Sequence, residues 1–158
     1  MKQTTLCYIK KNSSYLMLHR TKKQGDINKD KWLGVGGHFE QGENAEGCMK
    51  REVKEETGLN ALSYQYRGVV TFHSDQYESE KMHLFTIDSF SGNIIECDEG
   101  VLEWIPLEKL LELPMWEGDK IFLRLIANPN QKFFNLTLTY IGDSLKEAIL
   151  DGEKLFDY

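Results

Sequence analysis

Three acidic residues close together in the sequence are the best candidates for chemistry. Glu52, Glu55 and Glu56 lie within five residues after Arg51, and no Cys or His accompanies them at the spacing of metal ligands. A cluster of hard carboxylate oxygens suits Mg²⁺, or Mn²⁺, better than Zn²⁺. Such ions neutralise phosphate charge and lower the pKa of a water molecule. The cluster therefore indicates hydrolysis of a phosphoanhydride bond without a covalent nucleophile.

A single predicted helix positions these carboxylates. Asn44 is suited to cap its start and Gly58 to end it, which predicts about three helical turns. Its apolar stripe consists of Ala45, Met49 and Val53. At roughly 100° per residue, Glu52 and Glu56 project from this stripe, with Glu55 at its edge. Carboxylates in that position repel each other and lose hydration unless cations lie among them. The alternative is an acidic helix face in solvent.

The spacing around the glutamates resembles the signature of the Nudix hydrolase family at every fixed position. The stretch Gly37–Leu59 reads GHFEQGENAEGCMKREVKEETGL and has Glu43 and Arg51 at the intervals of that signature. The resemblance implies an α+β fold, a Nudix-type α/β/α sandwich with a mixed β-sheet. It also implies that Arg51 and Glu43 pair to hold the loop and helix together. The metal ligands that it implies are the carboxylates of Glu52, Glu55 and Glu56 and the carbonyl of Gly36.

The composition is that of a globular protein, with 41 % hydrophobic and 28 % charged residues in 158. We expect one domain spanning residues 1–158, present as a monomer or homodimer. The chain has neither a long apolar run nor a signal-peptide core, so we expect a cytoplasmic protein. Its formal charge of −6 argues against stable binding to nucleic acid or membranes. Its 3 cysteines support neither a disulfide framework nor a zinc site.

Sequence periodicity predicts the remaining elements. Strands are predicted over Thr4–Ile9, Tyr15–Leu18, Leu62–Phe72, Lys81–Phe90 and Val101–Ile105, and helices over Leu107–Leu113 and Trp116–Ile126. Alternating apolar residues after residue 132 predict a terminal hairpin. A helix at Leu145–Leu150 is the alternative there. The segment His19–Lys31 is basic and lacks apolar periodicity, which predicts a loop.

Two further groups of residues are candidates for the site. Arg20, Lys22 and Lys23 of the basic loop are placed to reach substrate phosphates, unless the loop is only a solvated connection. The Nudix resemblance implies that a carboxylate from a distant loop joins the site as a metal ligand or base. Glu99 is our first candidate for that carboxylate, followed by Glu96 and Asp98. The alternative for Glu99 is an acid in an exposed turn.

A segment near the last predicted helix indicates the substrate. Through Glu96–Trp104, Trp116 and Asp119 the chain resembles the oxidised-purine nucleoside triphosphatases, which include the MutX-like bacterial 8-oxo-dGTP diphosphatases. An exposed Trp116 would stack on a purine, and Asp119 would hydrogen-bond to its edge. Alternatively, Trp116 packs against the helix start and Asp119 caps it. Two departures concern substrate choice: Leu33 stands where the mammalian enzyme has a base-reading Asn, and His38, a candidate substrate contact, replaces a common Lys.

These observations predict an Mg²⁺-dependent nucleoside triphosphate diphosphatase. Its expected reaction converts 8-oxo-dGTP to the monophosphate and pyrophosphate, which sanitises the nucleotide pool, prevents mutation and so serves DNA repair. One alternative is Nudix hydrolysis of another linked diphosphate, such as ADP-ribose, a dinucleoside polyphosphate or an RNA 5′ end. A second alternative is a non-catalytic nucleotide sensor. Such a sensor would be expected to lack one of the signature glutamates, and all of them are present.

Overall fold

The computed structural model describes residues 1–22 and 25–157, which form a mixed β-sheet flanked by helices. The strands are β1 Lys2–Lys11, β2 Ser14–Arg20, β3 Trp32–Leu33, β4 Leu59–Ser74, β5 Glu80–Gly92, β6 Gly100–Pro106, β7 Phe134–Ile141, β8 Ser144–Leu150 and β9 Glu153–Asp157. They lie in the order β3-β2-β1-β5-β4-β7-β8-β9, and β6 pairs with β2 outside this path. The β1–β5 and β4–β7 pairs are parallel, whereas the other pairs are antiparallel. The sheet is therefore mixed, as predicted.

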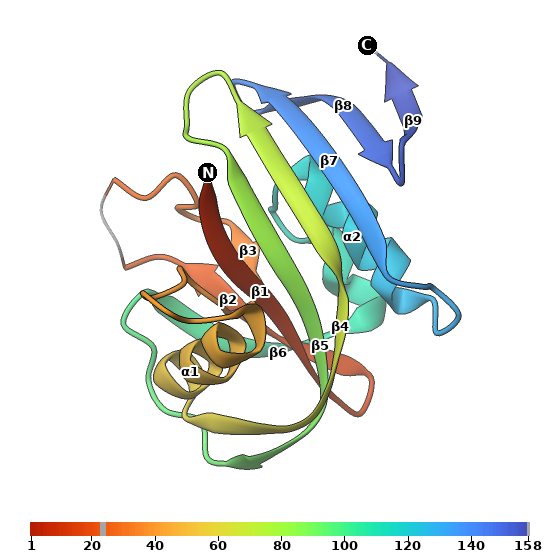
Figure 1. The fold of residues 1–158 in the computed structure, drawn as a ribbon. Helices are drawn as coiled ribbons and strands as arrows, with labels where there is room; N and C mark the ends of the chain where they lie inside the picture. The colour runs from red at the N-terminus through yellow and green to blue at the C-terminus, as the bar shows by residue number, and fades with distance from the viewer. Residues whose placement is uncertain (23–24, 158) are drawn as a thin grey trace.

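Helices cover both faces of this sheet (Figure 1). Helix α1 spans Ala45–Thr57, helix α2 spans Glu117–Ala127, and a 3₁₀ helix spans Leu107–Glu112. Alternation along β1 explains the two layers, because successive side chains point to opposite faces. Tyr8 joins the core that contains Phe122 of α2, and Ile9 joins the core that contains Met49 of α1. This arrangement confirms the predicted α/β/α sandwich. Neither α-helix of the described residues is long and apolar enough to cross a membrane.

Local signals define both ends of α1. The side chain of Asn44 accepts a hydrogen bond from the Gly47 backbone N–H at 2.8 Å, which caps the helix start. Gly58 has a left-handed backbone with a φ of 82°, and its N–H donates to the carbonyl of Lys54. The conformation at Gly58 is one that side chains with a Cβ atom rarely adopt. The helix predicted between Asn44 and Gly58 is therefore confirmed.

The C-terminal region contains the predicted hairpin, formed by β7 and β8, and a further strand that was not predicted, β9. Leu145–Leu150 lies in β8, so the helical alternative is wrong. Leu145 and Ala148 are both buried although they are three residues apart. A register shift between Thr139 and Tyr140 of β7 interrupts the pairing with β8 and explains this irregular spacing. Because three-residue spacing also fits a helix, the sequence pattern was ambiguous here.

The segment before α1 is anchored to β1, which carries the site toward the sheet. Val35 and Cys7 exchange backbone hydrogen bonds of 3.0 and 2.6 Å, and the Thr5 N–H donates to the carbonyl of Gly37 at 2.9 Å. Gly36 lies so close to β1 that a Cβ atom there would sit 2.0 Å from the carbonyl oxygen of Thr5. Only glycine permits this approach. The loop and the helix that follows it are therefore held against the sheet.

Candidate active site

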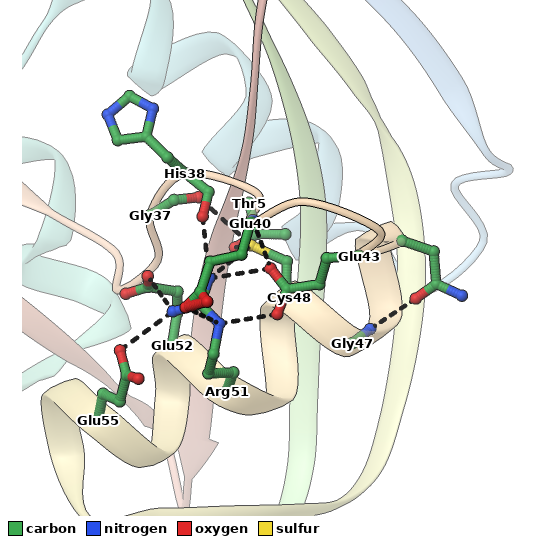
Figure 2. A network of polar contacts seen from close by, with 11 residues as sticks. Thr5, Gly37, His38, Glu40, Glu43, Gly47, Cys48, Arg51, Glu52 and Glu55 are labelled. Atoms are coloured by element: carbon green, nitrogen blue, oxygen red, sulfur yellow. Dashed lines mark hydrogen bonds and ion pairs between the residues drawn. The ribbon is translucent and has the colours of Figure 1, made fainter.

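Arg51 joins helix α1 to the loop that precedes it (Figure 2). Its Nε and Nη2 atoms donate to the two carboxylate oxygens of Glu43 at 2.7 and 2.9 Å. Nη2 also donates to the carbonyl of His38 at 2.9 Å. Hydrogen bonds from Arg51 lower the pKa of Glu43 to about 2. A bidentate arginine–carboxylate pair fixes both partners, so this contact gives Arg51 and Glu43 the means to hold loop and helix together.

Arg51 also orients two of the predicted metal ligands. Its Nη1 atom donates to Glu52 Oε1 at 2.8 Å and to Glu55 Oε2 at 3.1 Å. The Glu52 side chain is only 14 % exposed, and it lies beside Gly37, where a Cβ atom would sit 2.5 Å from the carboxyl carbon. The Glu55 side chain is 58 % exposed. Glu52 therefore faces the anchored loop, whereas Glu55 lies toward solvent.

Glu56 is the signature glutamate that lines a cavity beside helix α1. One of its carboxylate oxygens accepts a hydrogen bond of 3.4 Å from the backbone N–H of Gly36. Burial raises the pKa of Glu56 to about 9, and the nearby charges of Glu99 and Glu52 add to this effect. The distant acid Glu99 thus lies close enough to Glu56 to repel it. Three carboxyl groups from two separate segments are brought together at this point.

The chemistry of these groups fits a hard divalent cation. All the donors are oxygens, and the repulsion among Glu52, Glu56 and Glu99 is the kind that a bound cation removes. Within residues 1–22 and 25–157, no three acidic, His or Cys side chains already form a metal cage. The carboxylates of Glu52 and Glu55 are instead hydrogen-bonded to the guanidinium of Arg51. The residues that would hold a cation are Glu52, Glu56, Glu99 and the carbonyl of Gly36.

A cavity of about 320 Å³ adjoins the carboxylates. Its lining includes Glu56 and Glu99 and also Trp116 and Asp119, the residues predicted to contact a base. Residues from the signature helix and from the start of α2 therefore share one cavity, although they are far apart in the sequence. An extended ligand with an anionic part and an aromatic part suits such a lining.

Arg20 lines the cavity, but its guanidinium already has partners. Its Nε atom donates to Asp26 Oδ2 at 2.8 Å, and its Nη1 atom lies 3.3 Å from Glu99 Oε2. Its side chain is only 14 % exposed. We predicted a contact from Arg20 to substrate phosphates. The geometry instead makes Arg20 an organiser of Glu99 and of the neighbouring loop.

The other predicted substrate contacts have different surroundings. Lys22 donates to Glu96 Oε1 at 3.2 Å and to the carbonyl of Cys97 at 2.9 Å, and it does not line the cavity. Lys23 lies outside the described residues. His38 does line the cavity, and Figure 2 shows its imidazole pointing away from the Arg51 network. Of these three residues, the geometry keeps His38 as a candidate for ligand contact.

The expectation of an exposed Trp116 is wrong, because its side chain is 7 % exposed. Its ring makes edge-on contacts with Phe72 and Tyr140 at centroid distances of 5.9 and 5.1 Å. The Lys31 ammonium lies 4.6 Å from the ring centroid, and Nε1 donates to Asn28 Oδ1 at 2.7 Å. The alternative, in which Trp116 packs near the helix start, describes this environment better. The indole nevertheless forms part of the cavity wall.

Asp119 is buried in the first turn of α2, with 6 % exposure. It does not cap the helix, because the N-cap position belongs to Trp116 and has no side-chain cap. Burial, followed by the charge of Glu80, raises the pKa of Asp119 to about 8, and Lys31 opposes this rise. The carboxyl group therefore keeps its proton at neutral pH. In that form it can both donate and accept a hydrogen bond.

Several cavity residues were missed by the sequence analysis. They are Asp26, Asn28, Phe72, Glu80 and Tyr140. Asp26 and Asn28 belong to the predicted loop, where attention went to the basic residues alone. Asp26 and Asn28, two residues apart, indicated an ordered turn, because Asp and Asn stabilise turns through their side chains. The sequence does not identify Phe72 and Tyr140 as cavity residues, because an aromatic residue in a strand beside a cavity has the same pattern as one in the core.

Comparisons with known proteins agree with this geometry. Residues 2–126 match the NUDIX domain family model. An uncharacterised Nudix hydrolase, YvcI of Bacillus subtilis (strain 168), is 31 % identical over 145 residues, which cover 89 % of this chain and 87 % of that protein. The oxidized purine nucleoside triphosphate hydrolase of Danio rerio is 31 % identical over 106 residues, covering 66 % of this chain and 67 % of the relative.

A solved structure shows a similar fold over nearly the whole chain. The MutT protein of Bacillus halodurans superposes with a TM-score of 0.84 at 26 % identity, covering 97 % of this chain and 99 % of that one. The family model spans the segment that contains Arg51, the three signature glutamates and the loop anchored to β1. These matches confirm the family and the class of enzyme predicted from the sequence: the chain belongs to the Nudix family, whose hydrolases act on phosphoanhydride bonds.

Proposed function

We propose that this protein is a divalent-cation-dependent nucleoside triphosphate diphosphatase that acts on 8-oxo-dGTP in the cytoplasm, as a single domain. The observation that carries the proposal is the shared cavity, which is lined by Glu56 and Glu99 and by Trp116 and Asp119. The Danio rerio relative, named as an oxidized purine nucleoside triphosphate hydrolase, also supports it. Removal of oxidised nucleotides from the pool would prevent mutation.

The proposed reaction breaks the anhydride linkage between the α- and β-phosphates. Water supplies the oxygen, and the products are 8-oxo-dGMP and pyrophosphate. Glu52, Glu56 and the Gly36 carbonyl would hold Mg²⁺ or Mn²⁺, which when bound supplies charge neutralisation and makes the attacking water more acidic. Glu99, held 3.3 Å from Arg20, would complete the ligand set or accept the proton of that water. Arg51 keeps Glu52 in position through its 2.8 Å hydrogen bond.

Recognition of the oxidised base is assigned to Asp119. Oxidation at C8 converts N7 of guanine from a hydrogen-bond acceptor to a donor. A buried carboxyl oxygen of Asp119 would accept that new N–H, and Trp116 would contribute an indole wall beside the base. A buried polar group that loses its partner costs about 1–3 kcal/mol. The protonated carboxyl can also donate to the N7 acceptor of the unoxidised base, so discrimination of roughly 10–100-fold would come from the ionised, acceptor-only form, above a pH of about 8.

A substrate panel tests the proposed function. Pyrophosphate release would be measured in Mg²⁺ with 8-oxo-dGTP and dGTP at matched concentrations. ADP-ribose and a dinucleoside polyphosphate would be assayed for their own products. The expected result is the highest kcat/KM with 8-oxo-dGTP and loss of activity with a chelator. Equal or better turnover of ADP-ribose or the dinucleoside polyphosphate would refute the choice of substrate. Nucleotide binding without turnover would favour a sensor.

A matched pair of glutamine variants tests the metal assignment. Glu56→Gln is expected to lower kcat by roughly 10³-fold or more with the fold intact, because it removes a charged oxygen ligand. Glu46→Gln is the control, since Glu46 lies on the same helix but is exposed and bonds to Tyr64 and Lys50. Circular dichroism would check the fold of each variant. Near-normal activity of Glu56→Gln would contradict the assignment.

A further inference from the structure

The loop between β2 and β3 reaches the cavity through Asn28. Asp26, whose side chain is 6 % exposed, accepts hydrogen bonds at both carboxylate oxygens. Oδ1 accepts from the Asn28 backbone N–H at 3.0 Å, and Oδ2 accepts from Arg20 Nε at 2.8 Å. The carbonyl of Asn28 accepts from the Lys31 N–H at 2.9 Å. The backbone of Asn28 is therefore held on both sides, so that the loop can place its side chain reproducibly.

The orientation of the Asn28 side-chain amide follows from its partner. Trp116 Nε1 lies 2.7 Å from Asn28 Oδ1. An indole N–H can only donate, so the amide oxygen must be the atom that faces it. The amide NH₂ group then points in another direction, and in the described part of the chain no residue accepts a hydrogen bond from it. Two donors are left for a ligand.

The position of this NH₂ group in the cavity allows it to contact a ligand. Asn28 lines the same cavity as Trp116 and Asp119, which lie at the start of α2. The rest of the lining mixes charged and polar residues with apolar ones, which include Leu33, Phe72, Met82 and Leu138. A few fixed polar groups in a cavity generally determine how a ligand is oriented and which ligands bind. Asn28 is placed to be one of those groups.

We propose that Asn28 is a specificity-determining residue whose amide NH₂ donates a hydrogen bond to an exocyclic carbonyl oxygen of a bound purine. The inference rests on the proposed function, which places a purine in this cavity. Asn28 is half-buried, and a bound purine without that oxygen would cover the donor without pairing it. A donor that a ligand covers and leaves unpaired corresponds to a loss of roughly 10–100-fold in kcat/KM.

A purely structural role for Asn28 is the competing explanation, because its contact with Trp116 also docks the loop. Asn28→Asp separates the two roles. The aspartate keeps an oxygen that can accept from Trp116 Nε1, but it replaces the NH₂ donor with an acceptor. Asn130→Asp is the matched control, since it introduces the same charge in an exposed turn away from the cavity. Loop docking alone predicts the same response for every base.

Four nucleotides resolve which oxygen is recognised. dATP has neither oxygen, dGTP has the 6-oxo group, 8-oxo-dATP has the 8-oxo group, and 8-oxo-dGTP has both. Asn28→Asp is expected to lower kcat/KM roughly 10–100-fold for the nucleotides that carry the recognised oxygen, and to change the others by less than about 3-fold. Loss confined to dGTP and 8-oxo-dGTP identifies the 6-oxo group, and loss confined to the two 8-oxo nucleotides identifies the 8-oxo group. A uniform loss or no change overturns the inference.

Affinity measurements keep this test separate from the test of the proposed function. The four dissociation constants would be measured by titration calorimetry in the Glu56→Gln background, with and without Asn28→Asp. If the wild type hydrolyses none of the four nucleotides, the proposed function fails, but the ratios of dissociation constants still decide the role of Asn28. If the wild type discriminates among the four and Asn28→Asp leaves every ratio unchanged, only the Asn28 inference fails.

Discussion

Replacement of Asp119 by asparagine is expected to stabilise the protein at neutral and alkaline pH. The buried carboxyl has a pKa of about 8, against an ordinary value of 3.8. Between these values the folded protein keeps a proton that the unfolded chain releases. The stability due to this group is therefore complete below pH 3.8 and is lost as pH rises through about 8. At about 1.4 kcal/mol per pKa unit, the full loss is roughly 6 kcal/mol.

An asparagine side chain at this position would be close in size to that of Asp119 but would never ionise. The substitution removes the cost of ionisation above pH 8 but leaves a buried amide, which itself loses about 1–3 kcal/mol of hydration. We therefore expect Asp119→Asn to raise the free energy of unfolding by about 3 kcal/mol at pH 8 and to lower it by about 1–2 kcal/mol near pH 4, where only the amide penalty remains. The amide keeps an oxygen that can accept the N–H of the oxidised base and gains an NH₂ donor, so it matches the protonated carboxyl. Preference for 8-oxo-dGTP should therefore change little at neutral pH while stability rises.

Urea unfolding at several pH values between 4 and 9 measures this effect. Glu117→Gln is the control, because Glu117 is exposed in the same helical turn and loses the same charge. It should change stability by less than about 1 kcal/mol, through the helix dipole, with little dependence on pH across this range. If Asp119→Asn is less stable than the wild type at pH 8, or if its effect does not depend on pH, the buried-acid explanation is refuted.

Two further predictions concern the loop and its ion pair. Gly37→Ala should lower activity about 10–100-fold at a nearly unchanged melting temperature, because its Cβ atom displaces only the Glu52 carboxyl group. Gly36→Ala should lower the free energy of unfolding by more than about 2 kcal/mol, because its Cβ atom meets the carbonyl of Thr5. The melting temperature and the rate of pyrophosphate release would be measured for both variants. A Gly37→Ala variant that is less stable than the wild type would contradict this reasoning. Glu43→Gln should lose about 1–3 kcal/mol at pH 6. It should also lack the acid-induced loss of stability that the wild type shows as pH falls from about 4.5 to 2, and an unchanged acid transition would count against the Arg51 pair.

The elements specified by local chemistry were predictable from the sequence. Asn44 and Gly58 define α1 through hydrogen bonds within a few residues of themselves, and the structure has them in those roles. The C-terminal strands were less predictable because their pattern depends on a register shift between Thr139 and Tyr140 of β7. A shift of this kind results from pairing between strands. No local pattern in β8 reports it.

The contacts in the candidate site also differ in how well the sequence predicts them. The Arg51–Glu43 contact joins residues eight apart, which is why a spacing pattern could anticipate it. The buried Trp116 contacts Asn28, which is 88 residues away in the sequence, and also Phe72 and Tyr140. The order of residues gives no means to foresee these contacts, so the sequence does not predict the burial of this aromatic residue. Predictions of residue identity at the site were therefore easier than predictions of exposure.

Arg20 shows how the two parts of the cavity are linked. Its guanidinium pairs with Asp26, which holds the backbone of Asn28, and with Glu99, which adds charge beside Glu56. A 14 % exposed arginine between two carboxylates is costly to remove, because each acid would lose its partner. The same side chain thus supports the loop next to the base-binding residues and an acid next to the proposed metal ligands. This shared support explains why Arg20 is better placed to organise the site than to bind phosphate itself.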